Sequence, residues 1–365
     1  MEAIIENVAV PTVSIDEAVI RWQEQGFSTV ELEVISSDGE RVYPTDIQTH
    51  VHSVVRFRRA HFRKLKRDTE YQLTFSSGGQ ILCAKGESVF STLPNPNVER
   101  SGTIAVVADP HLTRDGTFRK GRLLGASFRL FEETLQRIRS GAHDVVVIPG
   151  DLADRGEEAA YMHAERCLAR FPGKSLVVPG NRDNLQLIRR YFPDVFQPQL
   201  IEVNGWTLIG LDTSSQELPS NAVVWLKKIL ESRERQRVLV FTHYALTRLS
   251  GRDSEQAIVN DRFVQEALNH RKKVFGVFSG HQNAVFMRRL GNTAHVVCPQ
   301  IVHYPCAWNV IELYPNGFLC WIREIEDPYL IHLSQCEGDR WLSPEWSRQR
   351  IGALSDRSFA HFPTL

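Results

Sequence analysis

Hydrophobic and polar residues alternate in two different ways along this chain, and the change falls near residue 100. Before it, apolar residues recur at every second position in short runs, a spacing typical of half-buried β-strands. Turn residues such as Ser37-Asp38-Gly39 separate these runs. After it, short continuous apolar runs alternate with longer stretches of helical spacing, which is typical of α/β layers. The pattern predicts strands at 18–22, 29–34, 52–57 and 70–75, and therefore a β-sandwich, ahead of an α/β region.

The second region is predicted to contain five helices, at 121–140, 157–171, 185–192, 221–234 and 258–270. Strands are expected between them at 103–109, 144–151, 175–181, 206–212, 237–243 and 273–280, with late antiparallel strands at 294–302, 308–314 and 318–325. A proline-rich polar stretch, 93–102, is typical of a linker. We therefore divide the chain into a β-sandwich at 1–94, an α/β domain at 103–327 and a C-terminal extension at 328–365.

Two features of the first segment are similar to those of immunoglobulin-like domains. An early strand carries Trp22, and Thr69-x-Tyr71-x-Leu73 stands where such domains have a tyrosine corner. The segment thus resembles a fibronectin type III or immunoglobulin-like domain. It also holds a basic run, which we interpret as a solvated edge strand protected by charge, with docking of an acidic partner as the alternative. The run comprises Arg56, Arg58, Arg59, Arg63, Lys64, Lys66 and Arg67.

The composition limits the classes of binding partner and the cellular compartment that we expect for this protein. Lys plus Arg and Asp plus Glu both number 43, so no net field attracts nucleic acid or an anionic membrane, and we expect neither partner. No apolar stretch is long enough for a membrane span, and no secretion leader opens the sequence, which indicates a cytoplasmic protein. Six cysteines lack C-x-x-C spacing and are interpreted as buried hydrophobic residues. The sequence leaves a homo-oligomer open.

Polar side chains follow five of the predicted strands. In open α/β sheets, ligands bind beyond the carboxyl ends of the strands, so these residues should meet there. Carboxylate, imidazole and amide oxygen suit divalent manganese, iron or zinc. Seven ligands are too many for one ion with a free position, whereas two ions bridged by one carboxylate fit the count. The residues are Asp109, His111, Asp151, Asn181, His243, His281 and Asn283.

The order of these residues resembles that of the calcineurin-like metallophosphoesterases, whose blocks are D-x-H, G-D, G-N-H-[DE], H and G-H-x-H. The resemblance implies a metallophosphoesterase β-sandwich flanked by helices. It implies that Asp109 and His111 hold a first metal, that Asp151 bridges, and that the remaining ligands hold a second. Those ligands are Asn181, His243 and His281. A bridging hydroxide would then attack phosphorus in line with the leaving oxygen.

Two positions depart from the family pattern. Asn283 stands where the family has its last histidine, so the first metal is expected to bind more weakly or to be a harder ion such as manganese. Arg182 stands where a histidine usually protonates the leaving group, and arginine cannot serve as an acid near neutral pH. It can still grip a phosphate, with Asp183 orienting it or capping the next helix. A similar G-N-R-D block occurs in UDP-2,3-diacylglucosamine hydrolases, so the arginine does not imply a dead enzyme.

The sequence as a whole is most similar to class III cyclic nucleotide phosphodiesterases, while a β-sandwich ahead of the catalytic domain resembles the domain order of purple acid phosphatases. We therefore expect a phosphodiesterase acting on a small phosphate ester, with Arg182 and Asp183 at the catalytic site. Arg182, Arg155 and Arg252 are expected to contact the substrate, unless the last two are solvated or paired with neighbouring acids. The alternatives are a phosphomonoesterase of the same fold, and a degenerate relative that binds a phosphorylated ligand or partner without turnover.

Overall fold

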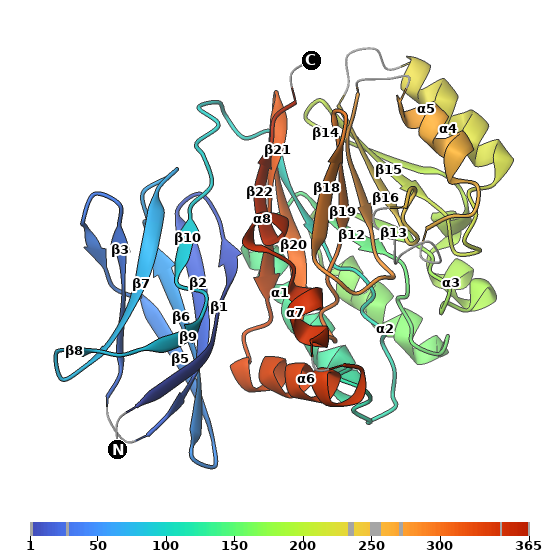
Figure 1. Cartoon of the computed structure of the whole chain (residues 1–365). Coiled ribbons are helices and arrows are strands. Elements are labelled where there is room, and N and C mark those ends of the chain that lie inside the picture. The colour runs from blue at the N-terminus through green and yellow to red at the C-terminus, as the bar shows by residue number, and fades with distance from the viewer. Residues whose placement is uncertain are drawn as a thin grey trace.

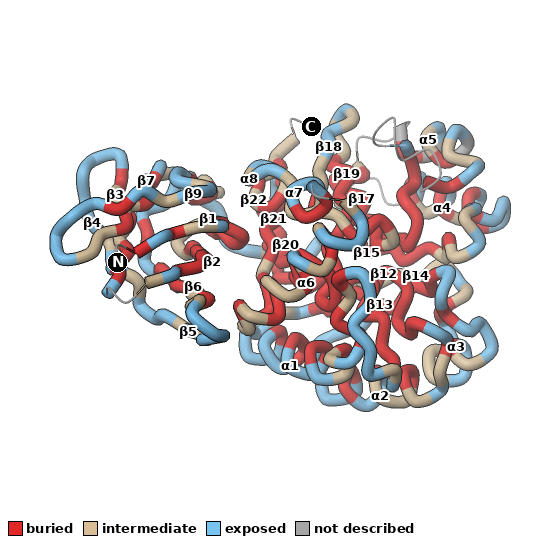
Figure 2. The backbone as a smooth tube through the Cα atoms, turned by 60° about the horizontal axis from the view of Figure 1, so that its bottom comes forward, coloured by how far each residue is buried: buried red, intermediate tan, exposed pale blue. Residues whose placement is uncertain are grey.

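The computed structural model describes residues 3–26, 29–232, 237–248, 257–269, 273–343 and 345–363. Figure 1 shows a lobe of strands at the N-terminal end beside a larger lobe of strands and helices. Figure 2 shows that buried residues are concentrated in the strands of both lobes and on the helix faces turned toward them. Arg252, one of the expected substrate contacts, lies outside the described residues.

The N-terminal lobe is the predicted all-β sandwich. One sheet has the order β5 (Asp46–His52), β6 (Val55–Arg63), β2 (Glu17–Gln25), β1 (Ile4–Val13) and β9 (Ala84–Gly86). The other has the order β10 (Val89–Ser91), β7 (Glu70–Ser77), β3 (Glu31–Ser36) and β4 (Arg41–Val42), and β8 (Gln80–Ile81) pairs with β7. Buried side chains of both sheets, such as Trp22 and Phe75 with ring centroids 5.4 Å apart, form its core.

Tyr71, which the sequence places at a tyrosine corner, makes a hydrogen bond of the kind that defines this feature. The hydroxyl of Tyr71 accepts a hydrogen bond from the backbone N–H of Lys66, five positions upstream, at 2.7 Å. A tyrosine corner ties the start of a strand to the preceding loop through such a bond. The fibronectin type III resemblance itself stays a prediction.

Two sequence-based interpretations of this lobe are wrong. The expected strand 52–57 spans a hairpin turn, because β5 ends at His52, β6 begins at Val55, and Ser53 between them has a φ of 56°. The basic run does not form an edge strand, since β6 lies between β5 and β2. Acidic residues of the neighbouring strand β2 stabilise its arginines within the sheet. Glu24 of β2 forms ion pairs with both Arg56 (2.6 Å) and Arg58 (3.2 Å).

The larger lobe contains two six-stranded sheets packed face to face. The first has the order β13 (Lys174–Val178), β12 (Val145–Pro149), β11 (Gly102–Val106), β20 (Ala307–Tyr314), β21 (Gly317–Glu324) and β22 (Ser358–His361). The second has the order β14 (Gln199–Val203), β15 (Trp206–Leu211), β16 (Arg237–Thr242), β17 (Val274–Ser279), β19 (Thr293–Val297) and β18 (Phe286–Leu290). Buried residues of both sheets, including Val106, Phe241 and Phe278, fill the space between them.

Helices cover the outer faces of both sheets. The first sheet packs against η1 (Leu124–Ala126), α1 (Ser127–Ser140), α2 (Glu158–Ala169), α3 (Leu185–Tyr191) and η2 (Pro193–Phe196). The second packs against α4 (Ser220–Ser232) and α5 (Asp261–Asn269). This arrangement is the expected αββα architecture. Among the described residues, no helix has both the length and the apolar character needed to cross a lipid bilayer.

The C-terminal segment packs along the same lobe. It forms α6 (Pro328–Trp341), α7 (Trp346–Ile351) and α8 (Leu354–Arg357) before β22 adds the last strand to the first sheet. Asp327 caps α6 by accepting from the backbone N–H groups of Tyr329 and Leu330. The buried ring of Trp346 lies 4.6 Å from the ring of His303, which places α7 beside a loop of the α/β lobe.

The cysteines only partly match the buried residues expected of them. Cys83 and Cys336 are exposed, so the interpretation is wrong for these two, whereas Cys167, Cys298, Cys306 and Cys320 are buried. All six are free thiols. The buried four therefore act as small apolar residues of the core.

Candidate metal centre

The seven expected ligands lie in loops that follow the carboxyl ends of parallel strands. Asp109 and His111 follow β11, Asp151 follows β12, and Asn181 follows β13. His243 follows β16, while His281 and Asn283 follow β17 of the facing sheet. Parallel neighbours end at the same edge, so both sheets deliver their loops to one place. The structure thus brings all seven residues together.

The backbone at these positions is unusual. Five of the seven have positive φ angles: Asp109 (43°), His111 (44°), Asp151 (48°), His281 (66°) and Asn283 (48°). Left-handed conformations cost energy for residues with a Cβ and persist where the surroundings impose them, often at functional sites. Gly180 has a related role, because a Cβ there would collide with the backbone and the carboxylate of Asp151. The Gly-Asn pair therefore lets the β13 loop approach the β12 loop closely.

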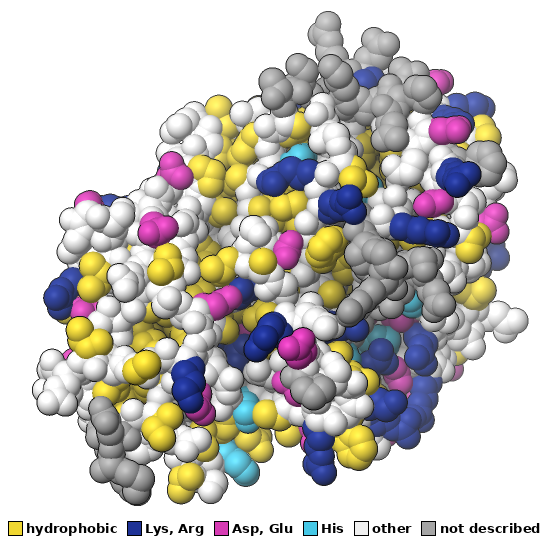
Figure 3. Space-filling view, in the orientation of Figure 1, with side chains coloured by type: hydrophobic (Ala, Val, Ile, Leu, Met, Phe, Trp, Pro, Cys, Tyr) yellow, Lys and Arg dark blue, Asp and Glu magenta, His cyan; other side chains and the backbone are white. Residues whose placement is uncertain are grey.

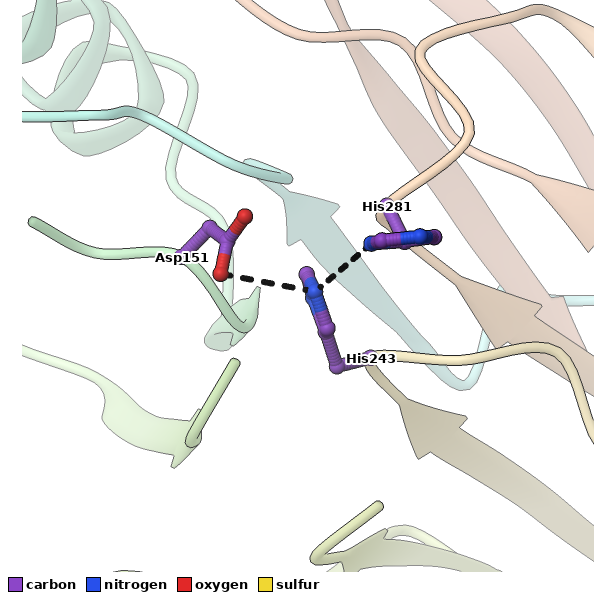
Figure 4. A group of neighbouring side chains, drawn as sticks. All are labelled: Asp151, His243 and His281. Carbon is purple, nitrogen blue, oxygen red and sulfur yellow. Dashed lines mark hydrogen bonds and ion pairs between the residues drawn. The ribbon is translucent and has the colours of Figure 1, made fainter. Parts of the chain in front are cut away.

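Four side chains converge at one side of the site, and Figure 4 shows three of them, Asp151, His243 and His281. Nε2 of His243 lies 2.9 Å from Oδ1 of Asn181, 3.4 Å from Oδ1 of Asp151 and 3.2 Å from Nδ1 of His281. Nδ1 of His281 is also 3.1 Å from Oδ1 of Asn181. Ligand atoms held at about 2.1 Å from one ion are roughly 3 Å from one another, so this group has the dimensions of a coordination shell.

The other side of the site presents buried polar atoms that make no hydrogen bond, although Oδ1 of Asp109 lies 3.3 Å from Nδ1 of His243. Oδ1 of Asp109, both ring nitrogens of His111 and Oδ1 of Asn283 are buried and make no hydrogen bond. Nε2 of His111 lies 3.8 Å from Oδ2 of Asp151, whose Oδ1 faces His243. Asp151 thus stands between the two groups with one oxygen toward each. Buried atoms of this kind are costly unless they bind something, and these donors suit a divalent ion.

The charges of the site favour a cation as well. Burial alone would lower the pKa of His243, but the carboxylates of Asp151 and Asp109 raise it to about 9. Burial, followed by the neighbouring His243, lowers the pKa of His281 to about 4. The two carboxylates therefore attract positive charge into a buried space that cannot hold two protonated histidines. Divalent ions would satisfy the same field.

Residues that sequence reasoning did not assign to the site hold the ligands in place. Oδ2 of Asp109 accepts from Nε2 of Gln300 (3.2 Å) and from the backbone N–H of His281 (2.7 Å). Nδ1 of His111 lies 3.2 Å from Oδ1 of Asp154. His303 contacts Asn283, with 2.6 Å between Nδ1 of the imidazole and Nδ2 of the amide. No local motif marks Gln300 or His303, because both contacts join segments far apart in the sequence.

Asp183 does not have either of the roles expected for it. Its carboxylate accepts hydrogen bonds from the backbone N–H groups of Gly180, Leu152 and Ala153 and from the hydroxyl of Tyr161. The cap of α3 is Asn184 instead. Burial and the nearby Asp151 raise the pKa of Asp183 to about 6. Because its oxygens are committed to the loop after Asp151, Asp183 supports that loop rather than orienting the Arg182 side chain.

A cleft with a volume of about 520 Å³ opens beside the ligands, and cations dominate its lining. Figure 3 shows Lys and Arg side chains gathered near histidines at the lower right of the molecule. Arg155 is paired with Asp115 at 2.7 Å, so the alternative of pairing with a neighbouring acid holds for this residue. Arg182 is exposed and forms no ion pair within the described parts of the chain. The cationic residues are Arg119, Lys120, Arg122, Arg155, Arg182 and Arg350.

The C-terminal segment forms one wall of this cleft. Leu342, Trp346 and Arg350 line it from the end of α6 and from α7. The guanidinium of Arg350 donates to the backbone carbonyl of Asn283 at 3.1 Å and to that of Gln282. The segment after residue 328 therefore braces the loop that carries the last two expected ligands.

The fold and the site define a metal-dependent phosphoesterase, and comparison with known proteins shows the family. Residues 102–284, half of the chain, match the sequence profile of the calcineurin-like phosphoesterases. The chain belongs to this family.

Relatives of known or assigned activity are distant. A probable cyclic nucleotide phosphodiesterase of Vesicomyosocius okutanii is 24% identical over 52% of this chain and 85% of its own. A probable glycerophosphodiester phosphodiesterase of Arcobacter nitrofigilis is 25% identical over 39% of this chain and 57% of its own. The cyclic AMP phosphodiesterase CpdA of Escherichia coli is 28% identical over 39% of this chain and 55% of its own. The chain thus spans little more than half the length of the last two.

Two solved structures are similar to parts of this chain. A dimetal phosphatase from Danio rerio has a TM-score of 0.52 at 14% identity, over 62% of this chain and 97% of its own. A purple acid phosphatase from yellow lupin has a TM-score of 0.42 at 13% identity, over 88% of this chain and 72% of its own. The first of these likenesses supports the metallophosphoesterase architecture described above.

Proposed function

We propose that this protein hydrolyses a small phosphodiester with the help of two divalent metal ions. The observation that carries the proposal is the position of Asp151, with Oδ1 facing His243 at 3.4 Å and Oδ2 facing His111 at 3.8 Å. One carboxylate with an oxygen toward each of two groups of ligand atoms is the arrangement expected of a bridge.

The ligands divide into two sets around that bridge. Asp109, His111 and the amide oxygen of Asn283 would hold one ion, and a second set would hold the other. When bound, the two ions would activate a water for attack on phosphorus and offset charge on the phosphoryl oxygens. The candidate ions are manganese, iron and zinc. The second set comprises Asn181, His243 and His281.

Arg182 supports a phosphate ester as the substrate. Its backbone N–H donates to Oδ1 of Asp151 at 2.8 Å, which fixes the residue beside the bridge, while its side chain reaches the cleft. A guanidinium at that place can hold a phosphoryl group through two hydrogen bonds and stabilise developing negative charge. The cleft's volume is in the range for small-molecule sites.

The preference for a diester rests on the supply of protons. Among the described residues that line the cleft, only His281 and His303 carry an imidazole. His281 is a proposed ligand, and His303 is hydrogen-bonded at both ring nitrogens. Because Arg182 cannot protonate a leaving group, esters whose leaving group needs less protonation are favoured. The relatives named as diesterases of cyclic nucleotides and glycerophosphodiesters support the same class.

The proposal is tested with manganese-loaded protein and a matched pair of substrates. We expect a higher kcat/KM for bis-p-nitrophenyl phosphate than for p-nitrophenyl phosphate, and two tightly bound ions per chain. In Asp151→Asn, we expect both the hydrolysis and the tight binding of the two ions to be lost. A panel of cyclic nucleotides, glycerophosphodiesters and nucleotide sugars would then narrow the substrate. A faster monoester would reverse the diester assignment, whereas at most one ion and no hydrolysis across the panel would indicate a phospho-ligand binding protein.

A further inference from the structure

A second cavity, of about 260 Å³, lies between the β-sandwich and the α/β lobe. Strands β1, β2 and β6 contribute to it from one side, and β20, β21 and the end of α1 contribute from the other. It shares none of its lining residues with the cleft at the metal centre. The cavity is therefore a separate place on the molecule, and a ligand bound there would be independent of the proposed hydrolysis.

Four glutamates line this cavity, and each already has an arginine partner. Glu17 pairs with Arg323 at 3.0 Å, and Glu324 pairs with Arg21 at 3.3 Å. Glu312 and Glu326 pair with Arg100 and Arg137 in the same way. The negative charges of the cavity are thus satisfied within the protein.

Arg59 of β6 also lines the cavity, and none of these glutamates forms an ion pair with it. Only 8% of this residue is exposed, it lines the cavity, and its Nε is buried without a hydrogen-bond partner. Within the described ranges, no carboxylate forms an ion pair with it. Burial lowers the pKa of Arg59, and the fields of Glu324 and Glu326 offset this only in part, yet an arginine stays charged near neutral pH. A buried charge without a partner is strongly unfavourable.

We propose that this interdomain cavity binds a small oxyanion, either inorganic phosphate or the phosphate group of a small phosphorylated metabolite. The planar guanidinium of Arg59 matches such an anion because it can donate two parallel hydrogen bonds. The volume suits a phosphate with a short organic part and is below the range typical of drug-sized ligands. Arg63 and Arg137 also line the cavity and are exposed, but each pairs with a glutamate, Arg63 with Glu17 at 4.0 Å and Arg137 with Glu326, so the anion contact is assigned to Arg59.

The test uses the full chain with Asp151→Asn as background, so that phosphate binding at the metal centre is suppressed. Inorganic phosphate and glycerol 3-phosphate are titrated calorimetrically, and the Tm is followed with and without each anion. We expect one binding event per chain, and Arg59→Met should weaken it by at least about tenfold while leaving the anion-free Tm unchanged or higher. Arg59→Lys should keep part of the affinity. Arg41→Gln removes an arginine that pairs with Glu33 on the other sheet of the sandwich, and should bind like the parent.

The results that would overturn the proposal are equal binding by the Arg59→Met and parent proteins, or phosphate binding that disappears with Asp151→Asn alone. If Arg59→Met does not fold, Arg59→Lys and Arg59→Gln carry the comparison, and equal affinity in both would again contradict the site. Similar affinities for the two anions would assign inorganic phosphate as the ligand. Tighter binding of glycerol 3-phosphate would assign a phosphorylated metabolite.

Discussion

Asn283 donates its Nδ2 amide to Nδ1 of His303 across 2.6 Å, and this bond decides which way the amide faces. Nε2 of His303 lies 3.0 Å from the backbone carbonyl of Lys120, which can only accept, so Nε2 carries the proton and Nδ1 is the acceptor. The amide nitrogen of Asn283 is therefore held by His303. Its Oδ1 is left buried and without a hydrogen-bond partner, and we propose that it is a ligand of the first metal.

Changing His303 should therefore alter metal affinity even though His303 is not a proposed ligand. In His303→Leu the amide can rotate, and we expect the affinity of the first site for Mn²⁺ to fall by about 10- to 100-fold. His303→Gln can still donate to Lys120 and accept from Asn283, so it should stay within a few-fold of the parent. Titration calorimetry and metal analysis after dialysis measure this effect without any substrate.

The two variants serve as controls for each other, because both remove the imidazole that packs on Trp346 at 4.6 Å. A similar drop in Tm but different Mn²⁺ affinity would isolate the orientation of the amide. If the leucine and glutamine variants bind manganese equally well, the Asn283 amide is not positioned by this bond.

Arg182 should act on the substrate rather than on the metals. Its side chain forms no ion pair within the described ranges, so its removal leaves no buried partner behind. We expect Arg182→Ala to lower kcat/KM for a diester by about 10²-fold with unchanged metal content. The kcat/KM of Arg182→Lys should fall between those of the parent and Arg182→Ala. Arg155→Ala is the matched control: its guanidinium already pairs with Asp115, and the loss should be below about tenfold. If Arg182→Ala and Arg155→Ala lower kcat/KM equally, Arg182 contributes only to the overall positive charge of the cleft and does not contact the substrate specifically.

The positions of the proposed ligands could be predicted from the sequence because each one follows a strand, and the apolar run of a buried strand is visible without any tertiary information. Asp109, Asp151 and His243 each come directly after such a run, and parallel strand order then brings them together. The αββα layers followed from the same alternation of runs and helical spacing.

Residues whose role depends on long-range contacts were not predictable in this way. The run around Arg58 looked like an exposed edge because its partner, Glu24, lies on another strand more than thirty positions away. Asp183 looked like a neighbour of Arg182, but its oxygens turn to the loop after Asp151. Arg350 reaches the loop of Asn283 only because the C-terminal helices fold back on the α/β lobe. Local pattern reports burial and spacing, while these contacts depend on how distant segments meet.

Asp183 should prove to be a structural residue of the site. Asp183→Asn replaces one of the two acceptor oxygens by an amide that faces backbone N–H donors, and we expect a loss of roughly 2–4 kcal/mol in the free energy of unfolding. Tyr161→Phe removes one hydroxyl that bonds both Asp183 and the N–H of Asn184, and should cost about 1–2 kcal/mol. Urea unfolding of the metal-free proteins measures both. A stable Asp183→Asn protein that lost only catalysis would instead favour a direct role in the reaction.

Acid sensitivity should originate in part from a histidine that is not among the proposed metal ligands. His295 on β19 is 3% exposed, and burial lowers its pKa to about 4 from an ordinary value of 6.5. The unfolded chain therefore binds a proton at pH values where the folded protein does not, so this residue contributes stability above pH 6.5 that is lost as the pH falls toward 4. Between about pH 7 and about pH 4.5 the loss amounts to about 2–3 kcal/mol. In His295→Leu, the free energy of unfolding of metal-free protein should depend less steeply on pH by that amount, whereas His52→Gln, at an exposed position, should follow the parent. If the free energies of unfolding of the parent and His295→Leu depend on pH in the same way, His295 is protonated to the same extent in the folded and unfolded protein over this pH range, and the prediction is wrong.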